Sequence, residues 1–368
     1  MIPFLSFDYQ DKLYRTKIIE SMINVLDSKW YVMGNELLSF ENEYASLHST
    51  KYSLGVANGL DALIISLKVL GIQTGDEVIV PSNTYIASWL AVSSVGATPV
   101  PVEPDEITYN INAALIEERI TPRTKAILPV HLYGQACDMT AIMEIAKKYN
   151  LSVVEDNAQS HLSTWKNKIT GSFGDINATS FYPGKNFGAL GDGGGITTDS
   201  EQLYSIAKSY RNYGSHIKYL NEIKGINSRL DELQASILRV KLPYLTELTR
   251  IRQNIASVYD LCLADCPFIK LPKTNKNATH VYHLYVIMCE NRDELQSYLR
   301  SKSIGTLIHY PIPPHLQLAY KELDFKEGDF PISERIARTC LSLPLYPGIT
   351  EDQIYQVSEA IINFYNNG

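Results

Sequence analysis

The sequence is poor in cysteine, has no long hydrophobic run and carries no excess of positive charge. Its five cysteines in 368 residues are an odd, scattered set that does not predict a disulfide framework. No apolar run approaches the roughly 20 residues of a membrane-spanning helix. The first residues also lack the basic and apolar segments of an export signal. We therefore expect a cytoplasmic protein without a membrane partner.

The composition also gives no reason to expect a metal or a nucleic acid. Cys262 and Cys266 are spaced for one helical face, but no second pair or nearby histidine would complete a zinc site. We therefore expect buried thiols and no metal. The 33 Lys and Arg against 40 Asp and Glu give a net charge of −7, which argues against an extended nucleic-acid surface. One local basic pocket could still bind a phosphorylated ligand.

Short β-branched runs alternate with helical patterns between residues 53 and 200. This alternation predicts an α/β fold with a mostly parallel sheet covered by helices. The expected strands are Glu77–Val80, Thr98–Glu103, Ala126–His131, Ser152–Asp156, Ala178–Phe181 and Gly195–Thr198, and the clearest helices are Leu60–Leu70 and Thr140–Tyr149. Because the composition changes after residue 245, we predict a large domain over residues 1–245 and a smaller C-terminal α/β domain over residues 246–368.

Four loops that follow predicted strands carry polar residues or glycines. In this architecture, ligands bind at loops at the carboxyl ends of the strands. Each motif by itself has an ordinary explanation as a helix cap, a solvated lysine in a turn or a tight glycine connection. The four loops are Asn58-Gly59-Leu60-Asp61, Asp156-Asn157-Ala158-Gln159, Ser180-Phe181-Tyr182-Pro183-Gly184-Lys185 and Gly191-Asp192-Gly193-Gly194-Gly195.

Taken together, the four loops fit the cofactor pyridoxal phosphate (PLP). PLP chemistry needs a lysine that forms a Schiff base and a carboxylate that keeps the pyridine nitrogen protonated. Lys185 and Asp156 supply these two groups. Gly59 and Leu60 open a predicted helix, whose N-terminus suits the cofactor phosphate. The glycines after Lys185 would let the backbone pass close to the cofactor.

The same motifs resemble the DegT-type sugar-nucleotide aminotransferases, in order and over essentially the whole chain. The resemblance implies a PLP enzyme of fold type I, with a mostly parallel seven-stranded sheet in the large domain. It also implies a homodimer whose active sites are built from both subunits. The motifs are Val154-Glu155-Asp156-x-Ala158-Gln159, Ser180-Phe181-Tyr182-Pro183-Gly184-Lys185-Asn186, Gly188-Ala189-Leu190-Gly191-Asp192-Gly193-Gly194 and Asn227-x-Arg229-Leu230-Asp231-Glu232-Leu233-Gln234-Ala235.

The resemblance also implies roles for the cofactor-binding residues. Lys185 is expected to hold PLP and, once the donor displaces it, to shuttle a proton. Asp156 would pair with the pyridine nitrogen, and Gln159 would hydrogen-bond the phenolic oxygen of the ring. Tyr85 would stack on the ring, although it could instead be an ordinary buried aromatic. The other expected contacts are Ala158 on the second ring face and Gly59, Leu60, Ser180 and the partner subunit's Asn227 on the phosphate.

The substrate-binding residues are less clearly indicated. The segment from residue 308 to residue 317 could line the sugar pocket or could be a proline-rich connection packed on the large domain. Arg229 could contact the substrate or form an ion pair at the helix that it precedes. The predicted substrate-binding residues are Tyr182, Asn186, Arg229, His309, Tyr310 and His315.

Variants within the motifs indicate one branch of the family. Leu60 stands where many members carry threonine, and Tyr182 stands where many carry histidine. Both variants resemble the branch that aminates C3 of dTDP-linked 3-keto-6-deoxyhexoses, the dTDP-3-amino-3,6-dideoxyhexose transaminases. We expect L-glutamate as the amino donor and a product used for surface polysaccharides, such as the O-antigen of lipopolysaccharide, or for other glycans.

Particular residues distinguish the expected function from several alternatives. A C4 aminotransferase acting on dTDP-4-keto-6-deoxyglucose differs only in substrate specificity and stays open. Sugar dehydration at C3 is disfavoured, because family relatives that dehydrate replace the lysine with histidine and this chain has Lys185. A non-catalytic PLP-binding regulator is disfavoured because the lysine and the carboxylate are both present. A nucleotide-sugar oxidoreductase would need G-x-G-x-x-G after the first strand, and that motif is absent.

Overall fold

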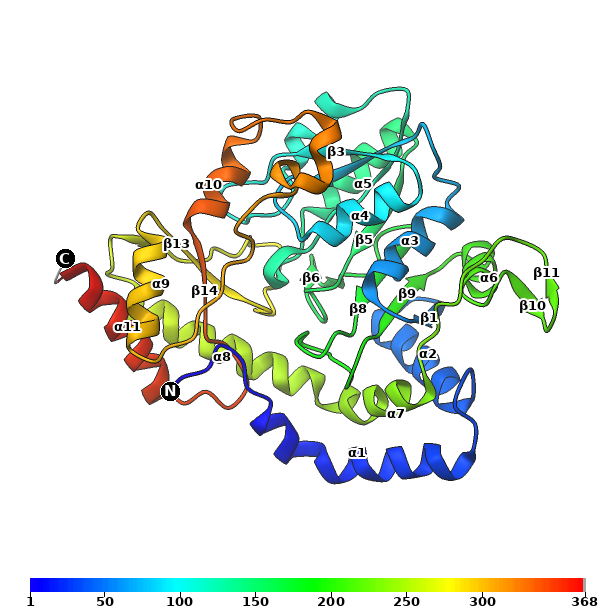
Figure 1. The fold of residues 1–368 in the computed structure, drawn as a ribbon, viewed down its shortest axis with the longest axis horizontal. Coiled ribbons are helices and arrows are strands. Elements are labelled where there is room, and N and C mark those ends of the chain that lie inside the picture. Colours follow the sequence, from blue (N-terminus) through cyan, green and yellow to red (C-terminus); the bar gives the residue numbers. More distant parts are fainter. Residues whose placement is uncertain (367–368) are drawn as a thin grey trace.

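A seven-stranded sheet forms the centre of the fold (Figure 1), seen in a computed structural model that describes residues 1–366. In spatial order its strands are β1 (Tyr52–Val56), β9 (Gly194–Thr198), β8 (Ile176–Ser180), β5 (Ser152–Asp156), β4 (Thr124–Ile127), β2 (Glu77–Pro81) and β3 (Thr98–Val102). β9 is antiparallel to both neighbours, and the other neighbouring pairs are parallel. The predicted mostly parallel sheet is therefore confirmed.

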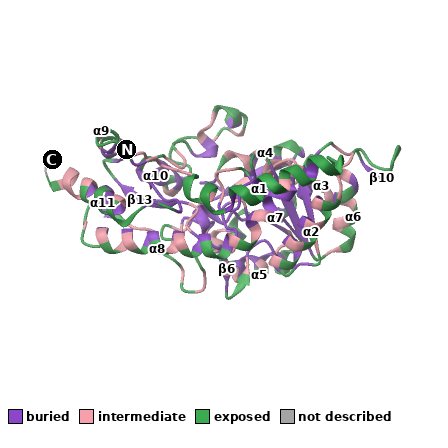
Figure 2. Cartoon of the chain, turned by 90° about the horizontal axis from the view of Figure 1, so that it is seen from below, coloured by how far each residue is buried: buried purple, intermediate pink, exposed green. Residues whose placement is uncertain are grey.

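Both faces of this sheet are covered, because successive strand residues point to opposite sides. In β2, Val78 and Val80 join one hydrophobic cluster while Ile79 joins another. Val154 and Val153 of β5 divide in the same way. Figure 2 shows the buried residues concentrated in this sheet. The covering helices are α3 (Gly59–Val69) on β8 and β9, with α4 (Ile86–Ser94) and α6 (Glu201–Tyr210) beside α3, α5 (Met139–Tyr149) on β4 and β5, and α2 (Asn35–His48) on β1.

The long helix α1 (Asp8–Ser28) and the shorter helix α7 (Glu232–Lys241) lie along the lower edge of the molecule in Figure 1. α1 packs against α7, which also contacts α2. Their contact buries Tyr14, Ile18 and Ile237. The opposite face of α1 stays open, and Ile19, Ile23 and Leu26 are exposed there. Single exposed apolar residues are normal on a protein surface, but these three lie together on one face of the helix.

The C-terminal part has its own antiparallel sheet. β13 (Tyr285–Cys289) pairs with β12 (Ile269–Lys270) and β14 (Cys340–Leu343). α8 (Leu245–Leu263), α9 (Arg292–Ser301) and α11 (Glu351–Asn366) pack around one cluster with these strands. Ile2 belongs to the same cluster and pairs with Ile304, so the first residues lie with the C-terminal part. The division at residue 245 falls at the start of α8 and stays a prediction.

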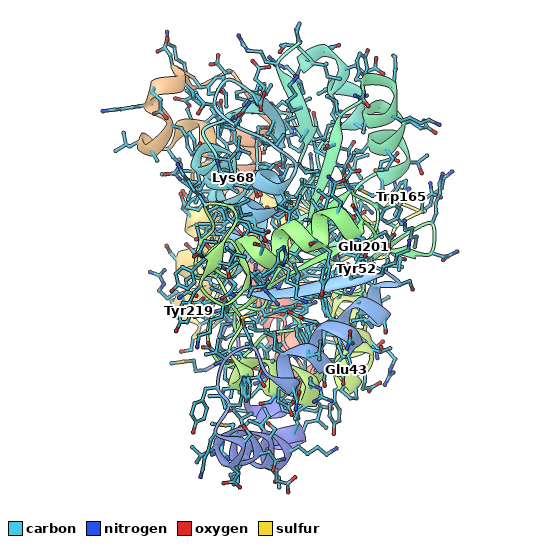
Figure 3. The ribbon with its side chains drawn as sticks, turned by 90° about the vertical axis from the view of Figure 1, so that its right-hand side faces the viewer. Glu43, Tyr52, Lys68, Trp165, Glu201 and Tyr219 are labelled. Carbon is cyan, nitrogen blue, oxygen red and sulfur yellow. The ribbon has the colours of Figure 1, made fainter. Side chains whose placement is uncertain are left out.

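Shorter elements connect these layers. The hairpin of β10 (Ser215–Ile217) and β11 (Leu220–Asn221) extends from the body, and Tyr219 at its turn lies at the margin of the molecule in Figure 3. The remaining elements are the hairpin β6 (Thr164–Trp165) and β7 (Lys168–Ile169), the helix α10 (Pro331–Thr339) and the 3-10 turns η1 (Ala113–Leu115), η2 (Glu117–Arg119), η3 (Leu132–Gly134), η4 (Leu242–Tyr244), η5 (Pro314–Leu316) and η6 (Leu318–Leu323).

Sequence patterns missed or misplaced a few elements. The strand before the Asn58 loop, β1, was predicted without bounds, because its Ser53 and Gly55 favour strands weakly and pairing with β9 helps to hold the segment extended. The strand predicted over Ala126–His131 ends at Ile127, and the chain then turns into η3. All five cysteines are free; Cys262 and Cys266 are only partly buried. Within residues 1–366, no helix is long and apolar enough to cross a bilayer, and no side-chain cluster suits a metal ion.

A buried ion pair joins α2 to β1 and to the residue that follows α6. Glu41 accepts hydrogen bonds from Arg211 and from the N–H of Gly55 (2.8 Å), and Arg211 also donates to the carbonyl of Gly55 (2.5 Å). Both side chains are almost fully buried. Removing one partner leaves an uncompensated charge inside the protein.

We therefore expect Glu41→Ala to lower the free energy of unfolding by about 3–5 kcal/mol. The measurement is urea unfolding followed by circular dichroism. The matched control is Glu36→Ala, which breaks a half-exposed pair and leaves Arg239 bound to Glu43, so its cost is about 0–1 kcal/mol. Equal losses for the two variants would show that burial of the Glu41 pair is not what makes it important.

Candidate active site

A cavity of about 860 Å³ lies where the carboxyl ends of the strands meet the C-terminal part of the chain. The ends of β5 and β8, the start of α3 and the first turn of α4 form one wall. Phe4, Leu5 and residues between positions 283 and 345 form the other. The predicted site residues that line it are Gly59, Leu60, Tyr85, Asp156, Ala158, Gln159, Ser180, Tyr182, Lys185, His309 and Tyr310.

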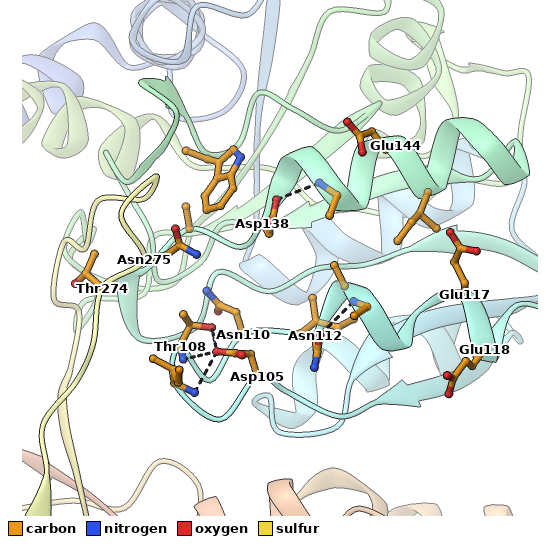
Figure 4. A pocket seen from close by; sticks show the side chains of 18 of the residues that line it. Asp105, Thr108, Asn110, Asn112, Glu117, Glu118, Asp138, Glu144, Thr274 and Asn275 are labelled. Atoms are coloured by element: carbon orange, nitrogen blue, oxygen red, sulfur yellow. Dashed lines mark hydrogen bonds between the residues drawn. The ribbon is translucent and has the colours of Figure 1, made fainter.

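A second cavity, of about 910 Å³, has a different character (Figure 4). Two of its carboxylates serve the local backbone: Asp105 accepts from the N–H of Thr108 (2.8 Å), and Asp138 accepts from that of Ala141 (3.0 Å). The residues predicted to carry chemistry do not line it. We therefore place the active site in the first cavity.

Asp156 supplies a buried carboxylate at the last position of β5. Its Oδ2 accepts a hydrogen bond from Ser88 Oγ (2.9 Å), and its Oδ1 accepts one from the N–H of Ala158 (3.1 Å). Burial raises the pKa of Asp156 above its ordinary value, although these two donors and the charge of Lys185 oppose that rise. A carboxylate fixed in this way can hold a cationic N–H group of a ligand.

Lys185 lies in the turn that follows β8. Its backbone N–H donates to the carbonyl of Tyr182 (2.9 Å), and its side chain lines the cavity. Burial lowers the pKa of Lys185, and the nearby carboxylate of Asp156 opposes this. A lowered pKa increases the fraction of neutral amine, which is the nucleophilic form. The arrangement therefore provides an amine that can form a covalent bond to a carbonyl in the cavity.

The start of α3 provides a site for a phosphate group. The first N–H groups of a helix have no intrahelical acceptor, and the helix dipole favours an anion there. Asn58 caps this end by accepting from the N–H of Asp61 (2.8 Å). A Cβ at Gly59 would lie 2.7 Å from Cβ of Ser180, so only glycine lets the two segments approach this closely. Gly59, Leu60 and Ser180 thus form one cradle.

Gln159 is oriented by its neighbours. Its Oε1 accepts from the N–H of Tyr133 (2.6 Å), so its Nε2 must be the donor that reaches the hydroxyl of Tyr310 (3.1 Å). The second Nε2 proton remains free to donate to a ligand oxygen. Tyr85 lies beside Tyr310, with ring centroids 5.2 Å apart, and lines the same cavity.

Four predicted site residues lie outside the cavity of this chain. Asn186 is buried, and its Nδ2 donates to the carbonyl of Val281 (3.0 Å). His315 pairs with Glu334 (3.1 Å) in a buried cluster. These two residues therefore hold neighbouring segments together. The other two lie on the segment after the β10–β11 hairpin: Asn227 is exposed, and Arg229 donates to Asn212 (3.2 Å).

Sequence reasoning missed several residues that line the cavity. Ser88 could have been found, because it lies one helical turn beyond Tyr85 on α4. Arg252 and His283 had no local signal, since α8 and the segment before β13 reach the cavity only through the tertiary fold. Phe4 and Leu5 were also missed, because the first residues of the chain carry no motif that indicates a binding site.

These residues fit PLP, and the fit rests on three observations. Among residues 1–366, the buried carboxylate of Asp156 accepts two hydrogen bonds, and it can hold a protonated pyridine nitrogen. The amine of Lys185 faces the same cavity, and the cradle at Gly59 suits the phosphate. The fold and the site together therefore define the class of the protein as a PLP-dependent aminotransferase of fold type I.

Comparison with known proteins agrees with this class. The model of the DegT/DnrJ/EryC1/StrS aminotransferase family matches residues 13–362. The chain therefore belongs to this family, and the predicted family, cofactor and enzyme class, a transaminase, are confirmed.

Two relatives and one solved structure are similar over nearly their whole length. The chain is 52% identical to dTDP-3-amino-3,6-dideoxy-alpha-D-galactopyranose transaminase of Aneurinibacillus thermoaerophilus, over 98% of this chain and 99% of that protein. It is 46% identical to dTDP-3-amino-3,4,6-trideoxy-alpha-D-glucose transaminase of Streptomyces venezuelae, over 98% and 95%. The crystal structure of S. venezuelae DesV in complex with a ketimine intermediate has a TM-score of 0.97 and 46% identity, over 99% and 98%.

Ser88 should tune the charge of Asp156. Removing its hydroxyl removes a hydrogen bond that favours the ionised carboxylate. We expect Ser88→Ala to raise the pKa of Asp156, so that the acid limb of the kcat/KM profile moves to higher pH. At neutral pH kcat/KM should fall by about tenfold, the effect of losing one hydrogen bond to a charged group.

The matched control is Ser93→Ala on the same helix, which removes a hydrogen bond to Tyr320 instead. This variant should keep the pH profile of the unmodified enzyme. A Ser88→Ala profile that drops in height without moving along the pH axis would contradict the proposed electrostatic role.

Proposed function

We propose that the enzyme transfers the amino group of L-glutamate to C3 of a dTDP-linked 3-keto-6-deoxyhexose, giving a dTDP-3-amino-3,6-dideoxyhexose. The single observation that carries the chemistry is the cavity that brings Lys185 and Asp156 together. The position of amination is supported by two relatives named as 3-amino sugar transaminases. The cavity volume of about 860 Å³ lies in the upper part of the about 300–1,000 Å³ range of small-molecule sites.

PLP, when bound, provides a carbonyl that takes up the amino group and a ring that accepts the electrons of the donor's Cα–H bond. Asp156 would keep the pyridine nitrogen protonated. Lys185 would hold the cofactor and, when its amine is free, would move the proton of the donor carbon. Gln159 would donate to the phenolic oxygen, and Gly59, Leu60 and Ser180 would bind the phosphate.

The sugar is proposed to lie against Tyr182, Tyr310 and His309. Nδ1 of His309 is bound to Ser342 Oγ (2.8 Å), which leaves its Nε2 for a ligand. Burial lowers the pKa of His309 to about 4, so the ring is neutral at physiological pH. A neutral imidazole and tyrosine hydroxyls suit the uncharged hydroxyls of a hexose.

The homodimer also belongs to this proposal. The exposed apolar face of α1 and the protruding β10–β11 hairpin, with exposed Tyr219, offer surfaces that a second copy can cover (Figure 3). Asn227 is exposed rather than turned into the cavity of its own chain, which agrees with a role in the partner's site. We place the reaction in the cytoplasm, where its product would supply O-antigen or other glycan synthesis.

Lys185→Ala should lower turnover by at least about 10³-fold, because the variant lacks both the covalent attachment and the proton shuttle. Amino-sugar formation is measured by chromatography with saturating PLP. The control is Lys166→Ala, which removes an exposed lysine and should leave turnover unchanged. Turnover by the Lys185 variant within tenfold of the unmodified enzyme would refute the assigned role.

The position of amination is tested by a half-reaction. Holoenzyme is first converted by glutamate to the aminated form of the cofactor, and dTDP-linked 3-keto and 4-keto 6-deoxyhexoses are then offered separately. We expect only the 3-keto sugar to restore the original absorbance, because amination is proposed at C3. Recovery with only the 4-keto sugar would keep the aminotransferase and overturn the proposed ring position.

A further inference from the structure

Arg252 is a buried cation that the reaction as described above does not use. It lies in α8, is 3% exposed and lines the cavity. Its Nη1 donates to the carbonyls of Tyr282 and Leu345, each at 3.2 Å. These two hydrogen bonds fix the guanidinium plane, so the rest of the group has a defined direction.

The opposite edge of the guanidinium is free. Among residues 1–366, Nε and Nη2 of Arg252 donate to no protein acceptor, and no carboxylate forms an ion pair with it. Neither nitrogen is completely enclosed by protein, and the residue lines the cavity. Nε and Nη2 point in the same direction, which is the geometry that binds the two oxygens of a carboxylate.

The surroundings add positive rather than negative charge. Burial lowers the pKa of Arg252 to about 10, so the side chain is still cationic at neutral pH. Burial lowers the pKa of His283 well below its ordinary value, and the positive charges of Lys185 and Arg252 lower it further. His283 is therefore neutral and cannot act as an acid. The carboxylate of Asp156 is already held by Ser88 and Ala158, so Arg252 lacks a counter-ion.

The geometry points to Arg252 as the residue that binds the α-carboxylate of the amino donor. Arg252 lines the same cavity as Lys185, which carries the reacting amine. The α-carboxylate is bonded to the carbon that carries the amino group. The diphosphate of a nucleotide sugar, in contrast, is separated from C3 by the sugar ring. This inference rests on the proposed use of an amino-acid donor.

The test compares the two half-reactions of the holoenzyme by stopped-flow absorbance. Arg252→Gln should raise the glutamate concentration for half-saturation by about 30- to 100-fold, as expected for removing one partner of a buried charge pair. Arg252→Lys should have an intermediate effect, because it keeps the charge and loses the paired donors. The second half-reaction, with the aminated cofactor and the keto-sugar, should change by less than about threefold, since no α-carboxylate takes part.

A binding measurement separates this role from a merely structural one. L-Glutamate is compared with its α-amide, in which the α-carboxylate is neutralised while the amine and the γ-carboxylate remain. The unmodified enzyme should prefer glutamate by at least about 30-fold, and Arg252→Gln should lose that preference. 2-Methylglutamate cannot lose an α-proton, so calorimetry can measure its dissociation constant without turnover. In Arg252→Gln this constant should rise together with the glutamate concentration for half-saturation. Arg250→Gln, an exposed arginine on the same helix paired with Glu247, is the matched control and should change none of these values.

Each other outcome overturns the inference. A selective loss in the keto-sugar half-reaction would assign Arg252 to the nucleotide diphosphate. Equal losses in both half-reactions would show that Arg252 has a structural role, in which it holds the backbone at Tyr282 and Leu345. If both substitutions prevent folding, the unmodified enzyme decides, and equal binding of glutamate and its α-amide refutes the role. Failure of the proposed sugar substrate is distinguishable, because the glutamate half-reaction does not need the sugar.

Discussion

Two adjacent carboxylates at the end of β5 hold the active site in place. Successive strand residues point to opposite sides, so Glu155 faces the protein interior while Asp156 faces the cavity. Glu155 accepts from His131 (2.8 Å) and from the N–H groups of Gly171 (2.9 Å), Phe173 (2.5 Å) and Gly174 (3.0 Å). Burial alone would raise the pKa of Glu155, but these donors hold it below its ordinary value. A charged Glu155 thus fixes the strand end on which Asp156 depends.

The electrostatics of the cavity follow from this arrangement. Asp156 is the buried anion that suits a cationic ring nitrogen, while Lys185, Arg252 and the start of α3 suit anions. His283 and His309 are neutral because burial lowers their pKa values. Positive charge therefore lies where a phosphate and a carboxylate are proposed to bind. Uncharged groups lie where the sugar is proposed to bind.

Sequence reasoning succeeded where a function depends on a short local motif. The strand Ser152–Asp156 was predicted with its observed bounds, and the loops around Gly59, Gln159 and Lys185, which were predicted to lie together, line one cavity. It failed where pairing or packing overrides local preference. β1 contains weak strand formers and is held by β9. His315 is a residue type that often binds ligands, but in the fold it is buried and pairs with Glu334.

The sequence by itself determined the α/β fold and the cofactor and indicated the residues proposed to react with it, because those residues lie within a few positions of the strands that carry them. Only the tertiary structure decided which distant segments close the cavity. Arg252, His283 and the first residues reach it from α8, from the segment before β13 and from the N-terminal end. No local pattern encodes these approaches, since they depend on how the C-terminal layer packs against the central sheet. Hydrophobic packing between layers is non-directional, and its result appears only in the folded molecule.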